Sequence, residues 1–170
     1  MRDGSESPGP IPSPRPPRGQ CLVECVHEVT KSFGGGNRAT WDDYFCALAL
    51  LISTRSPSEK LHVGCVMARD NRIISCGYNG FFSGLRHQSI SREGREVNTI
   101  HAEVNAVTDA ARRGVSLEGC TSYVTDMPCL DCTKCLLASG VRRVVYVREY
   151  RNDPLVAELC THAGMALVQR

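Results

Sequence analysis

The sequence predicts an α/β protein, a three-layer α/β/α domain in which helices flank a mixed five-stranded sheet. The first observation is a pair of segments rich in valine and isoleucine, 61–68 and 72–77, which the residues at 69–71 would join as a hairpin. The second is the alternation of helical and strand patterns from residue 101 onward. The third is length, because 170 residues are enough for one such domain and too few for two.

The remaining elements are expected in order along the chain. A helix is expected over 41–54, because its apolar residues recur every three or four positions, and Ser56-Pro57 ends it. Gly114 and Gly140 stand just after two later helices, where glycine commonly ends a helix. A polar loop over 82–98 comes after the hairpin, and beyond it we expect helices at 101–113, 129–139 and 154–163 and strands at 121–125, 143–147 and 166–168.

The N-terminal part differs in composition from the rest. Residues 1–38 form a Pro/Gly-rich tail that we expect to be mostly disordered, since six of the nine prolines lie within the first twenty residues. A short helix is predicted at 21–33, and the GGGN run at 34–37 separates it from the helix expected at 41–54. The folded domain is therefore expected to span 39–170.

Composition narrows the classes of function. The formal net charge of +2 is too small to indicate a polynucleotide partner. The longest apolar run, residues 45–52, is far shorter than the roughly 20 residues of a membrane span, so no membrane association is expected. The ten cysteines are scattered through apolar segments with no recognisable signal peptide, which favours reduced thiols and a cytoplasmic, intracellular location.

Two short motifs, HAE at 101–103 and PCLDC at 128–132, begin two consecutive predicted helices. Cys129 and Cys132 are one helical turn apart, so their sulfurs point the same way. A helix N-terminus also favours the thiolate form that a metal needs. One imidazole and two thiolates suit zinc, and the sequence therefore predicts a Zn²⁺ site held by His101, Cys129 and Cys132.

A fourth protein ligand would make this zinc structural rather than catalytic. Cys135 is the candidate, but six residues of helix displace it by about 9 Å from Cys129. Two sulfurs on one zinc lie within about 4 Å of each other, so Cys135 is excluded. Three ligands leave a position for water, and Glu103, two residues from a ligand, is placed to accept a proton from that water and give it back.

The pairing H-x-E…P-C-x-x-C is the signature of zinc-dependent deaminases that act on nucleobases. The two motifs together therefore indicate an enzyme that uses zinc-bound water to replace an amino group on an sp² carbon. The alternative from another class is a zinc-stabilised interaction protein that has lost turnover, although such a protein has no use for Glu103.

Further motifs extend the pattern over residues 41–170. They are WDDYF at 41–45, VG at 63–64, GYNG at 77–80, HAEVNA at 101–106, PCLDC at 128–132 and EYR at 149–151. On these motifs the chain resembles the cytidine and deoxycytidylate deaminase superfamily and, within it, the deoxycytidylate (dCMP) deaminases, which Asn105 distinguishes from tRNA adenosine deaminases. The resemblance implies zinc-dependent conversion of dCMP to dUMP with release of ammonia, which supplies dUMP for thymidylate synthesis. Another cytosine-type substrate, such as dCTP, deoxycytidine or the free base, is the open alternative.

The same resemblance implies which residues contact the substrate. Asn79 would hold the deoxyribose hydroxyl, the backbone around Ala102 the base carbonyl, and Tyr150 would cover the base. Ser56 and Lys60 would meet the phosphate, although relatives commonly have an arginine in place of Lys60 and lysine lacks its bidentate fork. The alternatives are a turn for Asn79, core packing for Tyr150 and a solvated side chain for Lys60.

Assembly and regulation are also implied only by resemblance. Many relatives are homo-oligomers, namely hexamers, activated by dCTP with Mg²⁺ and inhibited by dTTP. Arg112 would lie at the subunit contact, or would simply be exposed on its helix. A second, structural zinc is not expected, because residues 81–100 contain His87 but no cysteine.

Overall fold

A computed structural model describes residues 21–33, 36, 38–82, 84, 86–93, 95–150 and 153–170. At its centre is a five-stranded sheet in the order β2-β1-β5-β6-β7. The strands are β1 (Gly64–Arg69), β2 (Arg72–Tyr78), β5 (Thr121–Asp126), β6 (Arg143–Arg148) and β7 (Ala166–Gln169). β1 is antiparallel to both β2 and β5, whereas β5, β6 and β7 run parallel, so the predicted mixed sheet is confirmed.

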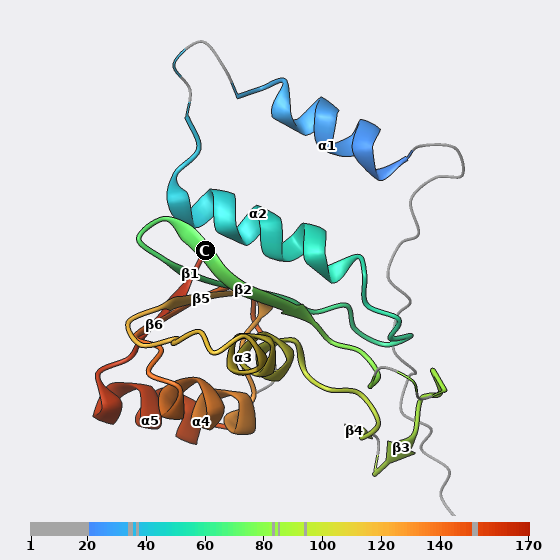
Figure 1. Cartoon of the computed structure of the whole chain (residues 1–170), viewed down its shortest axis with the longest axis vertical. Helices are drawn as coiled ribbons and strands as arrows, with labels where there is room; N and C mark the ends of the chain where they lie inside the picture. Colours follow the sequence, from blue (N-terminus) through green and yellow to red (C-terminus); the bar gives the residue numbers. More distant parts are fainter. Residues whose placement is uncertain are drawn as a thin grey trace, which may run out of the picture.

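Helices cover both faces of this sheet (Figure 1), which confirms the three-layer architecture. Helix α2 (Trp41–Ser53) covers one face, and the other is covered by α3 (Ala102–Arg112), α4 (Leu130–Ala138) and α5 (Leu155–Ala163). β1 is buried on both sides, since Cys65 and Met67 face the core under α3 to α5 while Val66 and Ala68 face the core under α2. The sheet therefore separates two apolar cores.

The predicted hairpin forms, but its first strand starts later than expected. The chain turns at Asp70 and Asn71, whose φ angles are 52° and 59°, as a two-residue type I′ turn requires. The expectation of a strand from residue 61 is wrong, because β1 begins at Gly64. The backbone of Leu61 and Val63 bonds instead to the side chain of Asn79.

The polar loop expected over 82–98 contains a small hairpin that was not predicted. It consists of β3 (Ser91–Arg92) and β4 (Arg95–Glu96). The Glu96 carboxylate accepts hydrogen bonds from the backbone N–H groups of Ile90 and Asn98. Local polar contacts rather than an apolar face therefore hold this hairpin, which is why no periodic pattern marked it.

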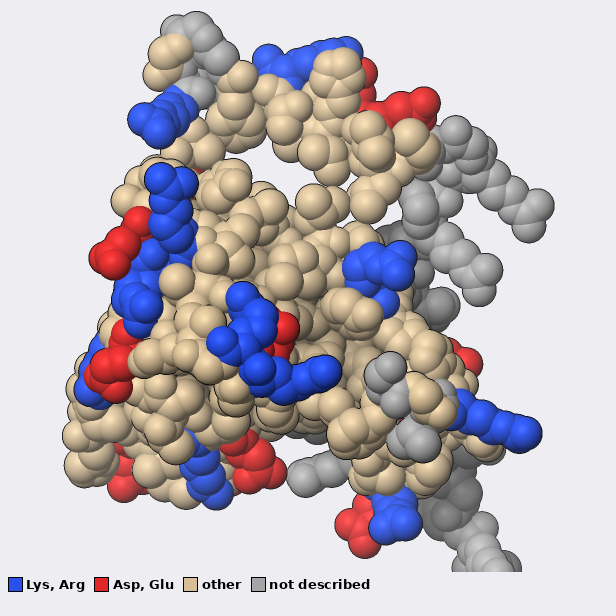
Figure 2. Space-filling model, viewed as in Figure 1, with Lys and Arg blue, Asp and Glu red and all other residues tan. Residues whose placement is uncertain are grey.

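Helix α1 (Leu22–Thr30) confirms the short helix expected at 21–33. None of its residues is buried, and it makes no close backbone contact with another described helix or strand. It stands over α2 in Figure 1, and the outer side of α2 exposes Trp41 and Tyr44. The surface over α2 is mostly uncharged on the face shown in Figure 2. The first twenty residues of the expected tail lie outside the described residues.

The cysteines and the helix lengths bear on two further expectations. None of the ten cysteines takes part in a disulfide bond in the structure. Within the described ranges, no helix is both long and apolar enough to cross a bilayer.

Gly77 allows α3 to lie directly against the edge strand β2. A Cβ at this position would lie 2.5 Å from the carbonyl oxygen of Ala102 and 2.6 Å from the backbone nitrogen of Ala106. No side chain fits in that space, so glycine is required for the close approach. The first turn of α3, which carries the HAE motif, is thereby fixed against the sheet.

Side chains of α3 and of the residue after it also cap the free edge of β2. The Asn105 Nδ2 donates to the carbonyl oxygen of Tyr78 at 2.8 Å, and the Arg113 Nη2 donates to that of Ile74 at 2.6 Å. Two carbonyl groups that an edge strand would leave without a partner are thus satisfied by the neighbouring helix.

Candidate active site

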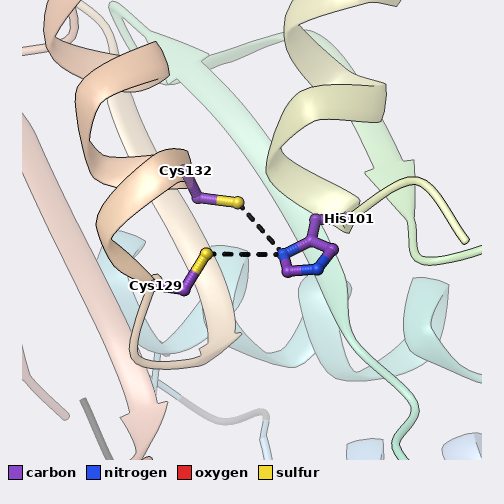
Figure 3. A group of neighbouring side chains, drawn as sticks. All are labelled: His101, Cys129 and Cys132. Carbon is purple, nitrogen blue, oxygen red and sulfur yellow. Dashed lines mark hydrogen bonds between the residues drawn. The ribbon is translucent and has the colours of Figure 1, made fainter. Parts of the chain in front are cut away.

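The starts of α3 and α4 bring three candidate ligands together (Figure 3). His101 is the N-cap residue of α3, Cys129 is the N-cap residue of α4, and Cys132 lies in the first turn of α4. Both sulfurs point at the imidazole, with Nδ1 3.5 Å from the Cys129 Sγ and 3.3 Å from the Cys132 Sγ. Because α4 connects the parallel strands β5 and β6, it starts at the carboxyl end of β5, where open α/β sheets bind ligands.

These separations fit a tetrahedral zinc. Zn–N and Zn–S bonds of about 2.0 and 2.3 Å place the nitrogen and each sulfur about 3.5 Å apart. The three ligand atoms all lie within 4.8 Å of one another, and one imidazole with two cysteine sulfurs is a donor set that suits zinc. Cys135 is not a member of this group, in agreement with the helix geometry.

Hydrogen bonds within the cluster already favour one thiolate. The pKa of Cys129 is lowered to about 3, first because the Cys132 thiol donates to its sulfur, and further because His101 and the backbone N–H of Cys132 do so. The pKa of Cys132 is raised because it is the donor in this pair and is buried. The pKa of His101 is raised by its hydrogen bond to Cys129. A bound cation would favour the second thiolate as well.

Glu103 lies beside these ligands in the first turn of α3. Its side chain is buried, with 4% of the residue exposed, and this burial raises the pKa of its carboxyl group. The Cys132 thiol lies close enough for each of the two groups to influence the pKa of the other. A buried carboxyl group with a raised pKa, next to a candidate metal ligand, is suited to both accepting and releasing a proton.

A family comparison identifies this arrangement. Residues 39–148 match the family model described as the cytidine and deoxycytidylate deaminase zinc-binding region. The chain belongs to this deaminase family. The matched residues include His101, Glu103, Cys129 and Cys132, so the zinc-binding domain of the family coincides with the cluster in Figure 3.

Similarity to individual proteins supports the assignment of the chain to this deaminase family. ComE operon protein 2 of Bacillus subtilis is 35% identical, over 78% of this chain and 72% of its own length. The deoxycytidylate deaminase of Schizosaccharomyces pombe is 38% identical over 78% of this chain, which spans only 44% of that relative. The crystal structure of the dCMP deaminase from cyanophage S-TIM5 in complex with dCMP and dUMP gives a TM-score of 0.69 at 27% identity, covering 75% of this chain and 95% of that one.

Asn79, the residue expected to hold a deoxyribose hydroxyl, is engaged with the backbone. Its Oδ1 accepts from the Val63 N–H at 2.8 Å, and its Nδ2 donates to the Leu61 carbonyl at 2.7 Å. An amide oxygen has two lone pairs and an amide nitrogen two protons, so one acceptor site and one donor remain. The substrate contact of Asn79 stays a prediction.

The loop after α2 places its two predicted phosphate residues differently. Lys60 is exposed, and its Nζ donates to the Ser91 Oγ at 3.2 Å. Ser56 is buried, and its Oγ accepts from the backbone N–H of Ser58 at 3.2 Å. The ammonium group of Lys60 therefore lies at the surface, while the Ser56 hydroxyl helps to shape the loop.

Tyr150, Ala102 and Arg112 occupy three different settings. Tyr150 is half-exposed just beyond the end of β6, and Arg151 of the same motif lies outside the described residues. Ala102 is fully buried, so only its backbone could meet a base. Arg112 is exposed and lines a hollow of about 260 Å³ between β2 and α3.

Proposed function

We propose that this chain hydrolyses dCMP to dUMP and ammonia with zinc held by His101, Cys129 and Cys132. The observation that carries the proposal is the buried Glu103 carboxyl group in the first turn of α3, close to the Cys132 thiol in the first turn of α4. When bound, zinc supplies a water that loses its proton near neutral pH.

Glu103 would move the protons of this reaction. Its carboxylate accepts a proton from the attacking water and passes it to the ring nitrogen N3 of the cytosine. It then transfers the second proton, from the hydroxyl group added at C4, to the exocyclic amine. Ammonia leaves, the C4 carbonyl forms, and Glu103 returns to its carboxylate form, so one water is consumed for each ammonia released. The raised pKa of this carboxyl group suits a residue that must both accept and donate.

The names of the relatives support dCMP as the substrate, and the chain offers groups for each part of it. Asn79 would bind the deoxyribose hydroxyl, the backbone at Ala102 the base carbonyl, and Tyr150 would cover the base. The loop of Ser56 and Lys60 would receive the phosphate, with the exposed ammonium group as its cation.

A substrate panel tests this proposal. Ammonia release is measured from cytosine, deoxycytidine, dCMP and dCTP with the zinc-loaded protein, and dCMP should have the highest kcat/KM. Lys60→Ala should lower kcat/KM for dCMP about tenfold and leave deoxycytidine unchanged, because it removes one partly solvated phosphate contact. Preference for deoxycytidine would refute the phosphate contact. Release from none of the four would refute the activity and favour an interaction module.

Regulation and assembly form part of the same proposal. We expect a homo-oligomer, a hexamer as the family resemblance implies, with Arg112 at the subunit contact. dCTP with Mg²⁺ should activate the same assay and dTTP should inhibit it. Sedimentation of the wild-type protein and of Arg112→Glu tests the contact, since a charge reversal at an arginine between subunits should dissociate the assembly.

A further inference from the structure

A buried carboxylate joins the ends of three strands beside the candidate site. Asp126, the last residue of β5, is 6% exposed. It accepts hydrogen bonds from Nε and Nη2 of Arg148, the last residue of β6, at 3.0 and 2.8 Å. The same Nη2 also donates to the His62 carbonyl at 3.3 Å, just ahead of β1. One guanidinium group thus contacts both β5 and the segment that enters β1.

Thr125 ties the same segment to the carboxylate a second time. Its Oγ1 accepts from the Gly64 N–H at 3.2 Å and donates to the Asp126 Oδ2 at 2.6 Å. A buried carboxylate is costly unless its oxygens are paired, so this network depends on the Arg148 guanidinium group. Removal of Arg148 would leave Asp126 with only the Thr125 hydroxyl as a partner and would release the tie to the His62 carbonyl.

Each arm of this network leads to a different part of the candidate site. His62 comes just after the loop of Ser56 and Lys60, Asp126 precedes Cys129 by three residues, and Arg148 precedes Tyr150 by two. The segment before β1 is also held from its other side, where the Asn79 amide bonds to Leu61 and Val63.

We infer that Arg148, fixed by Asp126, is a positioning residue that sets the substrate-binding loop relative to the metal ligands. This inference rests on the proposed function for its catalytic readout. Arg148 acts through other residues, because its hydrogen bonds hold the His62 carbonyl and the Asp126 carboxylate in place.

The opposite end of β6 provides a matched control. Arg143, its first residue, donates from Nη1 and Nη2 to Asp42 at 2.8 and 2.7 Å, also as a bidentate pair. That pair ties β6 to the start of α2 and contacts no segment of the candidate site. Arg143→Ala therefore removes an equivalent bidentate arginine–carboxylate pair from the same strand, but at the end of β6 that lies away from the zinc ligands.

The experiment compares wild type, Arg148→Ala, Asp126→Asn and Arg143→Ala as zinc-loaded proteins. Steady-state kinetics with dCMP and amide hydrogen exchange at Gly64 are measured together with thermal stability. For Arg148→Ala we expect KM to rise about tenfold and kcat to change less than threefold, since the loop moves while the ligands and Glu103 stay in place. Exchange at Gly64 should quicken about tenfold or more, because the segment just ahead of it loses the hydrogen bond from Arg148 to the His62 carbonyl.

Asp126→Asn should also raise KM and quicken exchange at Gly64. It keeps the Arg148 guanidinium group but replaces the carboxylate that binds it with a neutral amide. Arg143→Ala should lower the melting temperature without changing KM or exchange at Gly64. An unchanged KM or unchanged Gly64 exchange in Arg148→Ala would overturn the inference, and so would an equal KM rise in Arg143→Ala. Failure of the wild type to deaminate dCMP would reject the proposed function instead, and exchange at Gly64 would then decide the inference alone.

Discussion

Replacing Gly77 by alanine should displace the helix that carries His101 and Glu103. The new Cβ would lie 2.5 Å from the Ala102 carbonyl oxygen, which is 0.9 Å short of the 3.4 Å at which ordinary contact begins (3.4 − 2.5). The second neighbour, at 2.6 Å, is the backbone nitrogen of Ala106. Both atoms belong to the backbone of α3, so no side chain can rotate away and the helix itself must shift by most of that distance.

The magnitude of the effect depends on this shift. A misplacement of about 1 Å in a catalytic constellation can cost about 100-fold in rate. Overpacking of a tight contact costs roughly 1–3 kcal/mol of stability. For Gly77→Ala we therefore expect kcat/KM for dCMP to fall about 100-fold and the free energy of unfolding to fall by about 2 kcal/mol.

The assay is ammonia release from dCMP, together with thermal unfolding of the zinc-loaded protein. Cys76→Ala is the control, because Cys76 is the adjacent residue of β2, is exposed, and loses an atom rather than gaining one. It should leave both measurements near those of the wild type. Normal kcat/KM in Gly77→Ala would show that the position of α3 against β2 does not set the active site.

Three other perturbations probe the site and its surroundings. Glu103→Gln keeps the shape of the side chain but cannot carry the proton, so kcat should fall about 10²- to 10⁴-fold while the zinc content measured by mass spectrometry stays at one ion per chain; near-normal turnover would disprove its role. Dialysis against a chelator should abolish ammonia release and lower the melting temperature, and Zn²⁺ but not Mg²⁺ should restore both. The hydrogen bond from Arg143 lowers the pKa of Asp42 below its ordinary value of 3.8, so this pair stabilises the fold above that pH, and its contribution is lost as the pH falls through the lower folded-state pKa. Urea unfolding from pH 7 to 2 should show about 1 kcal/mol less stability at neutral pH for Asp42→Asn and a flatter acid limb, whereas an unchanged acid limb would contradict the assignment.

The parts of this protein that could be predicted from sequence are those with local patterns. The helices α2 to α5 show apolar spacing and have local end signals, Ser56-Pro57 after α2 and a glycine after each of the other three, so their bounds fall within one residue of the predicted ones. The start of β1 was misplaced because Leu61-His62-Val63 has strand-like composition, while Asn79 and Arg148, distant in sequence, hold its backbone outside the sheet.

In the candidate site too, the residues with a local sequence motif could be predicted and those that depend on distant contacts could not. The grouping of His101, Cys129 and Cys132 could be predicted because it depends on spacing within two short motifs, and the proton-carrying role of Glu103 stays a prediction. Asp126 and Arg148 were missed, since each alone is typical of a solvated charge and only the parallel pairing of β5 and β6 makes them neighbours. The hydrogen bonds of the Asn79 amide could not be predicted either, because their partners Val63 and Leu61 lie sixteen and eighteen residues away in the sequence.

The capped edge of β2 has a consequence for what this sheet can join. A strand from another molecule that sought to extend the sheet there would have to displace Asn105 from the Tyr78 carbonyl and Arg113 from the Ile74 carbonyl, losing about 1 kcal/mol at each. Asn105 is only two residues from Glu103 on the same helix. Any event that opened this border of the sheet would therefore also disturb turnover, so protection against misassembly and fidelity of catalysis depend on one short stretch of helix.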